Sequence, residues 1–232
     1  MDKKLLQKTA LEVRKSIVTE VHAAKSGHPG GSLSIADTLT YLYFYKMNVD
    51  PKNPKMDNRD RFVLSKGHTA PALYAVLAEK GFFDKAELVK LRKTGEMLQG
   101  HPDMKGTPGV DMSTGSLGQG ISAAVGMALG GKISNADYTV YTALGDGEIQ
   151  EGQGWEAAMS AAHYKLDNLV AVVDNNNLQI DGEVSKVMSV YPIVDKFESF
   201  GWNVTTCDAH DFDSIHAAFE KTILPVPGPW IK

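Results

Sequence analysis

The sequence predicts an α/β fold, a doubly wound and mainly parallel sheet flanked by helices. In the second half of the chain, short β-prone apolar runs alternate with helical segments, notably the runs at 138–144 and 169–173. Alternation of this kind gives right-handed crossovers and a parallel sheet with helices on both faces. Each of the two runs is followed directly by a segment rich in glycine or asparagine, as expected where a strand ends at the edge of a sheet.

The first half of the chain is predicted to be mainly helical. Apolar residues recur at helical spacing from about residue 3 to 25, so we expect an amphipathic helix that stops at Ser26-Gly27. A glycine-rich loop is expected over 27–32, and a second, well-buried helix over 34–47. Further along we expect, in order, a polar loop over 51–60, a strand over 61–64, a loop over 65–68, helices over 71–80 and 84–92, and a long loop over 100–115.

The segment 117–131 is predicted to be helical although it contains several glycines. Each glycine costs a helix about 1 kcal/mol relative to alanine, so their presence indicates close packing against another backbone or subunit. The elements expected after it are a strand over 138–144, a helix over 153–163, a strand over 169–173, a helix over 193–199, a strand over 202–205 and a helix over 212–223.

Length and composition favour one globular domain spanning residues 1–232. The formal net charge is −4, and the chain has no basic run interleaved with aromatic residues, so neither nucleic acid nor an anionic membrane is expected as a partner. The single cysteine, Cys207, cannot form an internal disulfide, which fits a reducing compartment. The N-terminus lacks an apolar signal core, and no apolar stretch is long enough to span a bilayer, so we expect a cytoplasmic protein.

Two polar motifs follow the predicted strands. Gly145-Asp146-Gly147 follows the first strand, and Asn176, within an aspartate and asparagine run, follows the second. Because ligands bind beyond the carboxyl ends of parallel strands, a carboxylate and an amide oxygen can meet there. Such oxygen ligands suit Mg²⁺ or Ca²⁺, with phosphate and water completing the coordination, and the glycines let phosphate approach the backbone. The alternative is a pair of unrelated turns, which are rich in the same residues.

Three of the seven histidines lie in glycine-flanked loops, namely His28, His68 and His101. Histidine donates hydrogen bonds to phosphate and hydroxyl oxygens and transfers protons near neutral pH, so we interpret these three as candidates for lining one polar cleft. Simple exposure is the alternative for each. The run 118–123 fits the dinucleotide pattern G-x-G-x-x-A, but a polar loop precedes it and no acidic residue ends the next strand, so NAD binding is rejected.

Taken together, these motifs resemble those of transketolase. They occur in the family's order: Ser26-Gly27-His28-Pro29-Gly30, Leu64-Ser65-Lys66-Gly67-His68, Gly100-His101-Pro102, Thr114-Gly115-Ser116-Leu117-Gly118-Gln119-Gly120, Gly145-Asp146-Gly147 and Asp174-Asn175-Asn176. The resemblance covers about residues 10–220. The related deoxyxylulose-phosphate synthases differ at the first histidine loop, so Gly-His-Pro-Gly favours transketolase.

The resemblance implies that the chain binds thiamine diphosphate and a divalent metal, Mg²⁺ or Ca²⁺. The metal ligands it implies are Asp146, Asn176 and the backbone oxygen of Leu178, and the diphosphate contacts are Gly147 and Asn176. It implies further cofactor contacts from His68, Gly115, Ser116 and Leu117, catalytic histidines facing the sugar at His28 and His101, and subunit-interface positions at Glu151 and Glu156. For these two glutamates, an ordinary solvated start of a helix is the alternative.

The activity implied by the resemblance is transfer of a two-carbon ketol unit from a ketose phosphate to an aldose phosphate. Whole transketolases are much longer, and the family's catalytic glutamate lies in a domain that has no counterpart here. The chain is therefore similar to the N-terminal subunit of a split transketolase, active with a C-terminal partner subunit that carries the pyrimidine-binding domain, and we expect self-association into a homodimer or heterotetramer. The alternatives are the half-site of another thiamine-diphosphate enzyme, such as a deoxyxylulose-phosphate synthase, or a non-catalytic truncated fragment.

The sequence departs from the family's pattern in two places. Ser116 replaces a proline that is common in full-length enzymes, and a proline-rich segment, 225–229, follows the last predicted helix. There the family continues with a further strand and a loop bearing another histidine. The chain stops about where that strand would begin. Either the family domain lacks its C-terminal end, which would leave an unpaired edge of the sheet, or the chain ends differently from the family.

Overall fold

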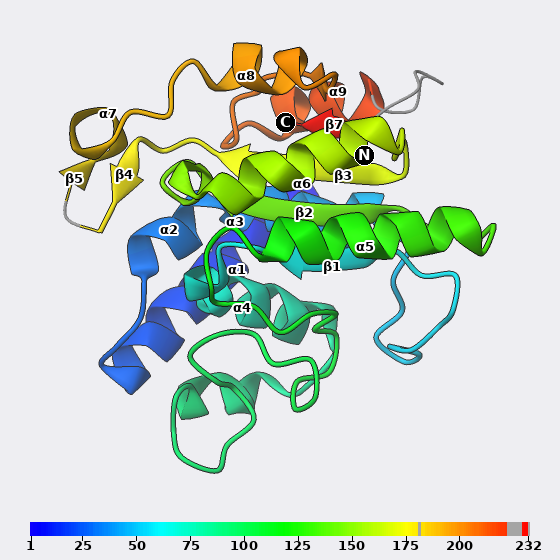
Figure 1. Ribbon diagram of the computed structural model, residues 1–232. Coiled ribbons are helices and arrows are strands. Elements are labelled where there is room, and N and C mark those ends of the chain that lie inside the picture. Colours follow the sequence, from blue (N-terminus) through cyan, green and yellow to red (C-terminus); the bar gives the residue numbers. More distant parts are fainter. Residues whose placement is uncertain (181, 222–228, 232) are drawn as a thin grey trace. The chain divides into compact units, whose positions relative to one another are not determined.

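Five strands form a parallel sheet in the computed structural model, which describes residues 1–180, 182–221 and 229–231. The strands follow the spatial order β1 (Arg61–Leu64), β2 (Val140–Gly145), β3 (Leu169–Asp174), β7 (Trp230–Ile231) and β6 (Asn203–Val204) (Figure 1). Every neighbouring pair in this sheet is parallel. With helices between the strands along the chain, the predicted α/β class is confirmed.

The C-terminal segment corrects one expectation. Trp230–Ile231 pairs in parallel with β3 on one side and with β6 on the other, so it lies inside the sheet. Among the described residues, a strand therefore forms next to β3 where the sequence analysis expected none, while the expectation that the family domain lacks its C-terminal end stays a prediction. Tryptophan and isoleucine both favour strands, but a run of two residues is too short to predict one from sequence, and this strand forms by pairing with β3 and β6.

The chain divides into two compact units. The first comprises Met1–Asp60, Gly67–Gly115 and Asp208–Ala217, and the second comprises Arg61–Lys66, Ser116–Cys207 and the residues from Ala218 onward. The sheet belongs to the second unit. The assignment of residues 1–232 to one domain stays a prediction.

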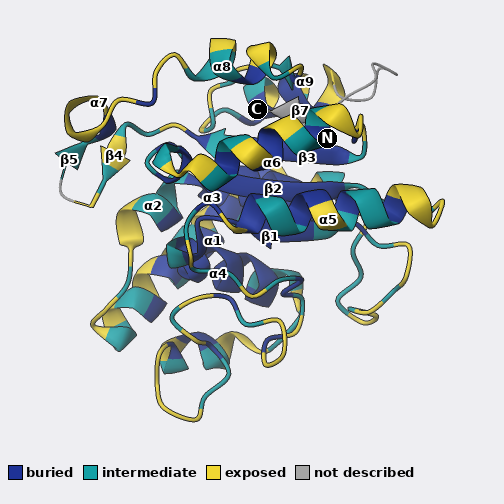
Figure 2. Ribbon diagram, viewed as in Figure 1, coloured by how far each residue is buried: buried dark blue, intermediate teal, exposed yellow. Residues whose placement is uncertain are grey.

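Helices and a small hairpin complete the second unit. They are α5 (Gly120–Ile133), the 3₁₀ turn η4 (Glu148–Gln150), α6 (Gly152–His163), the hairpin strands β4 (Leu178–Gln179) and β5 (Gly182–Glu183), α7 (Val184–Val187) and α8 (Ile193–Ser199). Helix α5 packs against β1, β2 and β3, and α6 packs beside α5. The residues of β2 and β3 are almost all buried (Figure 2).

Aromatic side chains attach α8 to α6. The ring of Trp155 lies 5.0 Å from that of Phe197 and stacks on Phe200 at 5.8 Å, measured between ring centroids. Trp202 packs edge-on against Phe197, and its indole nitrogen donates a 2.9 Å hydrogen bond to the backbone oxygen of Ala158. Large aromatic rings bury much apolar area and their polar atoms need partners, so this cluster stabilises the α6–α8 contact.

The first unit is helical. Its elements are α1 (Lys3–Ala24), α2 (Pro29–Ser34), α3 (Ala36–Tyr41), the π-helix η1 (Leu42–Lys46), the 3₁₀ turn η2 (Gly67–Thr69), α4 (Ala70–Lys80), the 3₁₀ helix η3 (Lys85–Lys90) and the start of α9 (Phe212–Glu220). The predicted loop at 27–32 is wrong in part, because α2 begins at Pro29, whose fixed φ suits the first turn of a helix. The predicted helix over 34–47 is broken into α3 and a π-helical turn.

Helix α1 begins and ends with recognisable caps. The carboxylate of Asp2 accepts a hydrogen bond from the backbone nitrogen of Leu5, and Lys25 ends the helix in the left-handed conformation. One face of α1 packs against α3, α4 and η3. Among the described residues, no helix combines the length and apolar character needed to cross a membrane.

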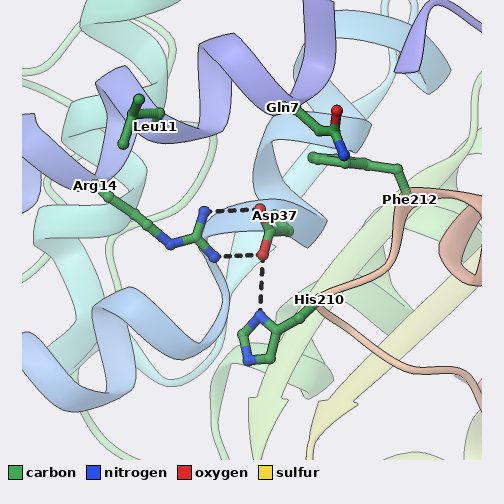
Figure 3. Close-up of a pocket in the computed structure, with 6 residues that line it drawn as sticks. All are labelled: Gln7, Leu11, Arg14, Asp37, His210 and Phe212. Atoms are coloured by element: carbon green, nitrogen blue, oxygen red, sulfur yellow. Dashed lines mark hydrogen bonds and ion pairs between the residues drawn. The ribbon is translucent and has the colours of Figure 1, made fainter. Parts of the chain in front are cut away.

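An ion-pair network ties the segment 208–217 to α1 and α3 within the first unit. Arg14 donates through both terminal nitrogens to Asp37, one bond measuring 2.7 Å, and His210 Nδ1 lies 3.0 Å from the same carboxylate (Figure 3). Asp37 is buried, whereas the side chain of His210 is 60% exposed. These residues line a shallow open pocket with Gln7, Leu11 and Phe212. A bidentate arginine–carboxylate pair is geometrically specific, so it fixes α1 against α3, and the contact of His210 with the same carboxylate attaches the segment to them.

Glu20 is the exception on the apolar face of α1. It continues the buried row of Leu6, Ala10, Val13 and Ile17 and is itself 0% exposed. Neither carboxylate oxygen has a hydrogen-bond partner among the described residues. Burial raises the pKa of Glu20 to about 10 from an ordinary 4.5, so the side chain is neutral at pH 7.

Replacing Glu20 should therefore stabilise the protein. The folded-state pKa lies above the unfolded one, so the stability that wild type derives from binding this proton is complete below about pH 4.5 and is lost as pH rises towards 10. The free energy of unfolding of Glu20→Gln should exceed that of wild type by a margin that grows with pH. The margin should increase by about 1.4 kcal/mol for each pH unit between about 4.5 and 10. Urea unfolding at pH 5 and pH 8 measures it, and Glu12→Gln, on the exposed face of α1, is the control. A pH-independent difference between Glu20→Gln and wild type would contradict the assignment.

Candidate functional site

In the second unit, β1, β2 and β3 are neighbours in the parallel sheet, and polar residues follow their carboxyl ends (Figure 1). Gly145 lies opposite Asp174 in the sheet register, and the backbone nitrogen of Asp146 donates a 3.2 Å hydrogen bond to the backbone oxygen of Asp174. On the other side, the backbone nitrogen of Lys66 donates to Ala143. The expectation that the two predicted strand ends lie side by side is confirmed.

Asp146 is a buried carboxylate with room for further ligands. It is 2% exposed, and its two oxygens accept hydrogen bonds from the backbone nitrogens of Gly147 at 2.9 Å and Asn177 at 2.6 Å. Burial raises its pKa, while these two hydrogen bonds act in the opposite direction. No cationic side chain forms an ion pair with Asp146 among the described residues. A carboxylate offers about four lone-pair positions, so two remain after the backbone amides are counted.

The turn after β3 carries the other predicted metal ligands. Asn176 Oδ1 accepts a 2.9 Å hydrogen bond from the backbone nitrogen of Leu178, and Leu178 then enters the short β4–β5 hairpin. The bond from Asn177 to Asp146 places this turn against the predicted metal ligand that follows β2. Over the described residues, no group of three or more His, Cys, Asp or Glu side chains could hold a metal. The predicted ligand set is not a group of that type, because it consists of one carboxylate, one side-chain amide oxygen and one backbone oxygen.

A buried ion pair lies at the same strand ends as Asp146. Lys66 Nζ donates to the carboxylate of Asp174, and the two side chains are only 2% and 6% exposed. The sequence alone does not reveal this pair, because 108 residues separate its members. Asp174 ends β3 and Lys66 follows β1, so the pair spans the end of β2 that lies between them.

Glu148 is a second buried carboxylate at these strand ends. It is 2% exposed and accepts hydrogen bonds from the backbone nitrogens of Gly118 and Gly145, both at 3.0 Å, and from the hydroxyl of Ser65 at 2.5 Å. Burial raises its pKa and the three hydrogen bonds lower it. A side chain at Gly120 would place its Cβ 2.5 Å from Ser65 Cα, so only glycine allows α5 to start here.

The predicted cofactor-contact turn leads into this network. Ser116 is exposed and Leu117 is half-buried, and they directly precede Gly118. The backbone oxygen of Ser116 accepts a 3.2 Å hydrogen bond from Gln119, which closes the turn before α5. Gly118 has a φ of +80°, and a Cβ there would lie 2.8 Å from Glu151 Cβ, so the turn requires glycine.

The three loop histidines come together in the first unit. The rings of His28 and His68 meet edge to face with centroids 5.1 Å apart. Burial lowers the pKa of His28, and the charges of Arg92 and His101 lower it further. The backbone of His101 is held in place by Tyr74, whose hydroxyl donates a 3.0 Å hydrogen bond to the backbone oxygen of His101.

Two glycines allow these histidine loops to pack. A Cβ at Gly67 would lie 2.7 Å from the backbone nitrogen of Gly115, and a Cβ at Gly115 would lie 2.9 Å from His101 Cγ. Gly115 also has a φ of +146°, which favours glycine. The predicted clustering of His28, His68 and His101 thus has a structural basis, while their roles stay predictions.

The two predicted interface glutamates lie at the start of α6. Glu151 precedes the first residue of the helix and Glu156 lies in its second turn, and both are exposed. Glu151 packs beside Gly118, and the backbone oxygen of Glu156 accepts a 3.0 Å hydrogen bond from the Ser160 hydroxyl, as on an ordinary solvated helix. Their role at a subunit interface stays a prediction.

The sequence matches the family described as transketolase, thiamine diphosphate binding domain, over residues 6–227. Among curated proteins, the chain is 50% identical over 216 residues to the 6-deoxy-6-sulfo-D-fructose transketolase subunit SqwG of Clostridium sp. (strain MSTE9), covering 93% of this chain and 78% of that subunit. It is 46% identical over 208 residues to an apulose-4-phosphate transketolase subunit of Phocaeicola vulgatus, covering 90% of this chain and 74% of that protein.

Longer relatives match over a smaller share of their length. The chain is 46% identical to human transketolase over 217 residues, which is 92% of this chain and 34% of that enzyme. Among solved structures, the transketolase of Campylobacter jejuni superposes with a TM-score of 0.93 at 35% identity, covering all of this chain and 37% of that one.

The buried Lys66–Asp174 pair should dominate the stability of the strand ends. Lys66→Met removes the cation that forms an ion pair with the buried Asp174 carboxylate, and breaking a buried pair of this kind costs about 3–5 kcal/mol. The double variant Lys66→Met, Asp174→Leu should recover most of that loss, because it removes the buried negative charge together with the positive one. Urea unfolding without cofactor measures both, with Lys132→Met at the exposed Lys132–Asp167 pair as control. A loss in Lys66→Met no larger than in the control would contradict this interpretation.

Proposed function

Because the chain belongs to the transketolase family and carries that family's thiamine diphosphate binding domain, we propose that it is the N-terminal subunit of a transketolase made of two kinds of chain. The relatives named as subunits support this proposal, since the chain covers 78% and 74% of two of them. The partner would be a C-terminal subunit carrying the pyrimidine-binding domain. Self-association of the assembly into a heterotetramer, or of this chain into a homodimer, and a cytoplasmic location belong to the same proposal.

The proposed activity is transfer of a two-carbon ketol unit from a ketose phosphate to an aldose phosphate. The observation that carries it is the buried Asp146 carboxylate at adjacent strand ends, bonded to the turn that contains Asn176. A carboxylate and an amide oxygen at this position suit a divalent cation bound to a diphosphate. The bound cofactor supplies the stabilisation of the carbanion, and the chain supplies binding and orientation.

The donor set of this structure fits Mg²⁺, or Ca²⁺ in its place. Asp146 is buried without a cationic partner among the described residues, and a buried carboxylate is costly unless a charge compensates it. Lys66 does not serve, because its ammonium group donates to Asp174. We therefore assign the metal to Asp146, Asn176 and the backbone oxygen of Leu178.

The remaining cofactor contacts follow from the same assignment. Gly147 and Asn176 would contact the diphosphate, and the predicted further contacts come from His68, Gly115, Ser116 and Leu117. Gly147 follows the metal ligand directly and has no side chain to hinder a phosphate. Exposed Glu151 and Glu156 would lie at the subunit interface.

His28 and His101 are the proposed sugar-contacting residues. Both are exposed, and the lowered pKa of His28 keeps its ring neutral at physiological pH. A neutral imidazole both donates and accepts hydrogen bonds, so it can orient sugar hydroxyls and move a proton between oxygens.

The relatives favour a second candidate for the donor substrate. Two relatives are named as transketolase subunits for 6-deoxy-6-sulfo-D-fructose and for apulose 4-phosphate. This chain is 50% identical to the first and 46% identical to the second. A donor of this kind would keep the ketol chemistry and change only the far end of the sugar. A donor panel of xylulose 5-phosphate, 6-deoxy-6-sulfo-D-fructose, apulose 4-phosphate and pyruvate separates these possibilities, and transfer from pyruvate alone would indicate synthase-like chemistry.

The function is tested by assaying transfer to an aldose phosphate with Mg²⁺ and thiamine diphosphate. The chain is assayed alone and then with a second chain that carries the pyrimidine-binding and C-terminal domains. We expect turnover only in the mixture. No turnover with any ketose donor, in a mixture where the two chains are shown to bind, would contradict the proposal.

Asp146 provides the sharpest test of the cofactor assignment. Asp146→Asn keeps the size of the side chain but removes its charge, so thiamine diphosphate affinity in Mg²⁺ should fall at least 100-fold. Asp167→Asn is the matched control, since Asp167 is an exposed aspartate in the same unit. Calorimetric titration of the full chain with its partner measures both. Unchanged affinity in Asp146→Asn would remove Asp146 from the site.

A further inference from the structure

We propose that Glu148 is a positioning residue whose buried carboxylate fixes the turn before α5 onto the ends of β1 and β2 and so shapes the backbone that receives the diphosphate. The inference rests on the proposed function and adds to it a residue that touches neither cofactor nor metal. Glu148 lies two residues after Asp146, at the first position of η4. None of the sequence motifs assigned above includes it.

Three segments of the second unit meet at this one carboxylate. One oxygen accepts from the Ser65 hydroxyl at 2.5 Å and from the Gly118 backbone nitrogen at 3.0 Å, and the other accepts from the Gly145 backbone nitrogen at 3.0 Å. Ser65 follows β1, Gly145 ends β2 and Gly118 precedes α5. The Ser65 oxygen in turn accepts a 3.2 Å hydrogen bond from the backbone nitrogen of Ile121, inside α5.

The position requires a carboxylate because all three partners are donors. An ionised carboxyl group only accepts hydrogen bonds, and both of its oxygens are used here. A glutamine would turn an amide NH₂ group towards one of these donors and leave a buried backbone amide without a partner. Since an unsatisfied buried donor is costly, the turn would shift away from the strand end.

The two backbone amides belong to the segments assigned to the cofactor. Gly145 directly precedes the metal ligand Asp146, and Gly118 directly follows Ser116-Leu117. Glu148 therefore joins the metal loop to the cofactor-contact turn through one side chain. Burial raises the pKa of Glu148, while its three hydrogen bonds and the charge of Lys66 act in the opposite direction. Removing this link should loosen the diphosphate site while the core of the sheet stays in place.

The test compares Glu148→Gln with Thr142→Val in the full chain with its partner subunit. Thr142 donates a buried 2.9 Å hydrogen bond to Val63 between the same two strands, so its loss weakens β1–β2 without touching either loop. Titrations with thiamine diphosphate and with inorganic pyrophosphate, each in Mg²⁺, report the diphosphate site directly. Thermal melts without ligand report stability.

We expect Glu148→Gln to weaken both ligands at least tenfold, and Thr142→Val to change either affinity less than twofold although its melting temperature falls. Equal affinities in Glu148→Gln and wild type would overturn the inference, as would equal losses in the two variants. If Glu148→Gln does not fold, Ser65→Ala replaces it, with an expected loss of about threefold or more, and wild-type affinity in Ser65→Ala overturns the inference. Failure of wild type to bind either ligand would instead refute the proposed function, and this inference with it.

Discussion

Charged groups buried at the carboxyl ends of β1, β2 and β3 must find compensation, because a buried charge without a partner is unstable. Lys66 and Asp174 compensate each other, and Glu148 is held by three donors. Asp146 has two backbone amides and no ion pair among the described residues, so it retains capacity for a cation. The assignment of metal and diphosphate to this edge follows from that difference between neighbouring carboxylates.

In the first unit, close packing of backbone segments positions the loops that carry the histidines. Gly67 and Gly115 leave no space for a Cβ, and their loops carry or support His68 and His101. Gly115 leaves room for the side chain of His101, and the Tyr74 hydroxyl donates a hydrogen bond to the backbone oxygen of the same histidine. Such irregular loops on a helical scaffold are where binding residues commonly lie. Each unit thus supports its proposed contacts with its own buried interactions.

The sequence predicted the regular elements well and the long-range contacts poorly. Periodicity identified α1, α4, α6 and α8 and strands β1, β2 and β3, because each is long or strongly apolar. Periodicity missed α2, because Gly30 and Gly31 suggested a loop. It also missed β7, a strand of two residues that forms by pairing with strands far away in the sequence. Glu148 and the Lys66–Asp174 pair were missed because their partners lie far away in sequence. The residue roles came from the order of the motifs in the sequence, and they stay predictions.

The central claim is that a divalent metal bound to Asp146 anchors the diphosphate at the end of β2. The most direct measurement is a crystal structure of the full chain with its partner subunit, thiamine diphosphate and Mn²⁺, with the metal located by anomalous scattering. We predict one Mn²⁺ bound by the Asp146 carboxylate, Asn176 Oδ1 and the backbone oxygen of Leu178, in contact with the diphosphate. Bound cofactor with its metal away from Asp146 would contradict the account.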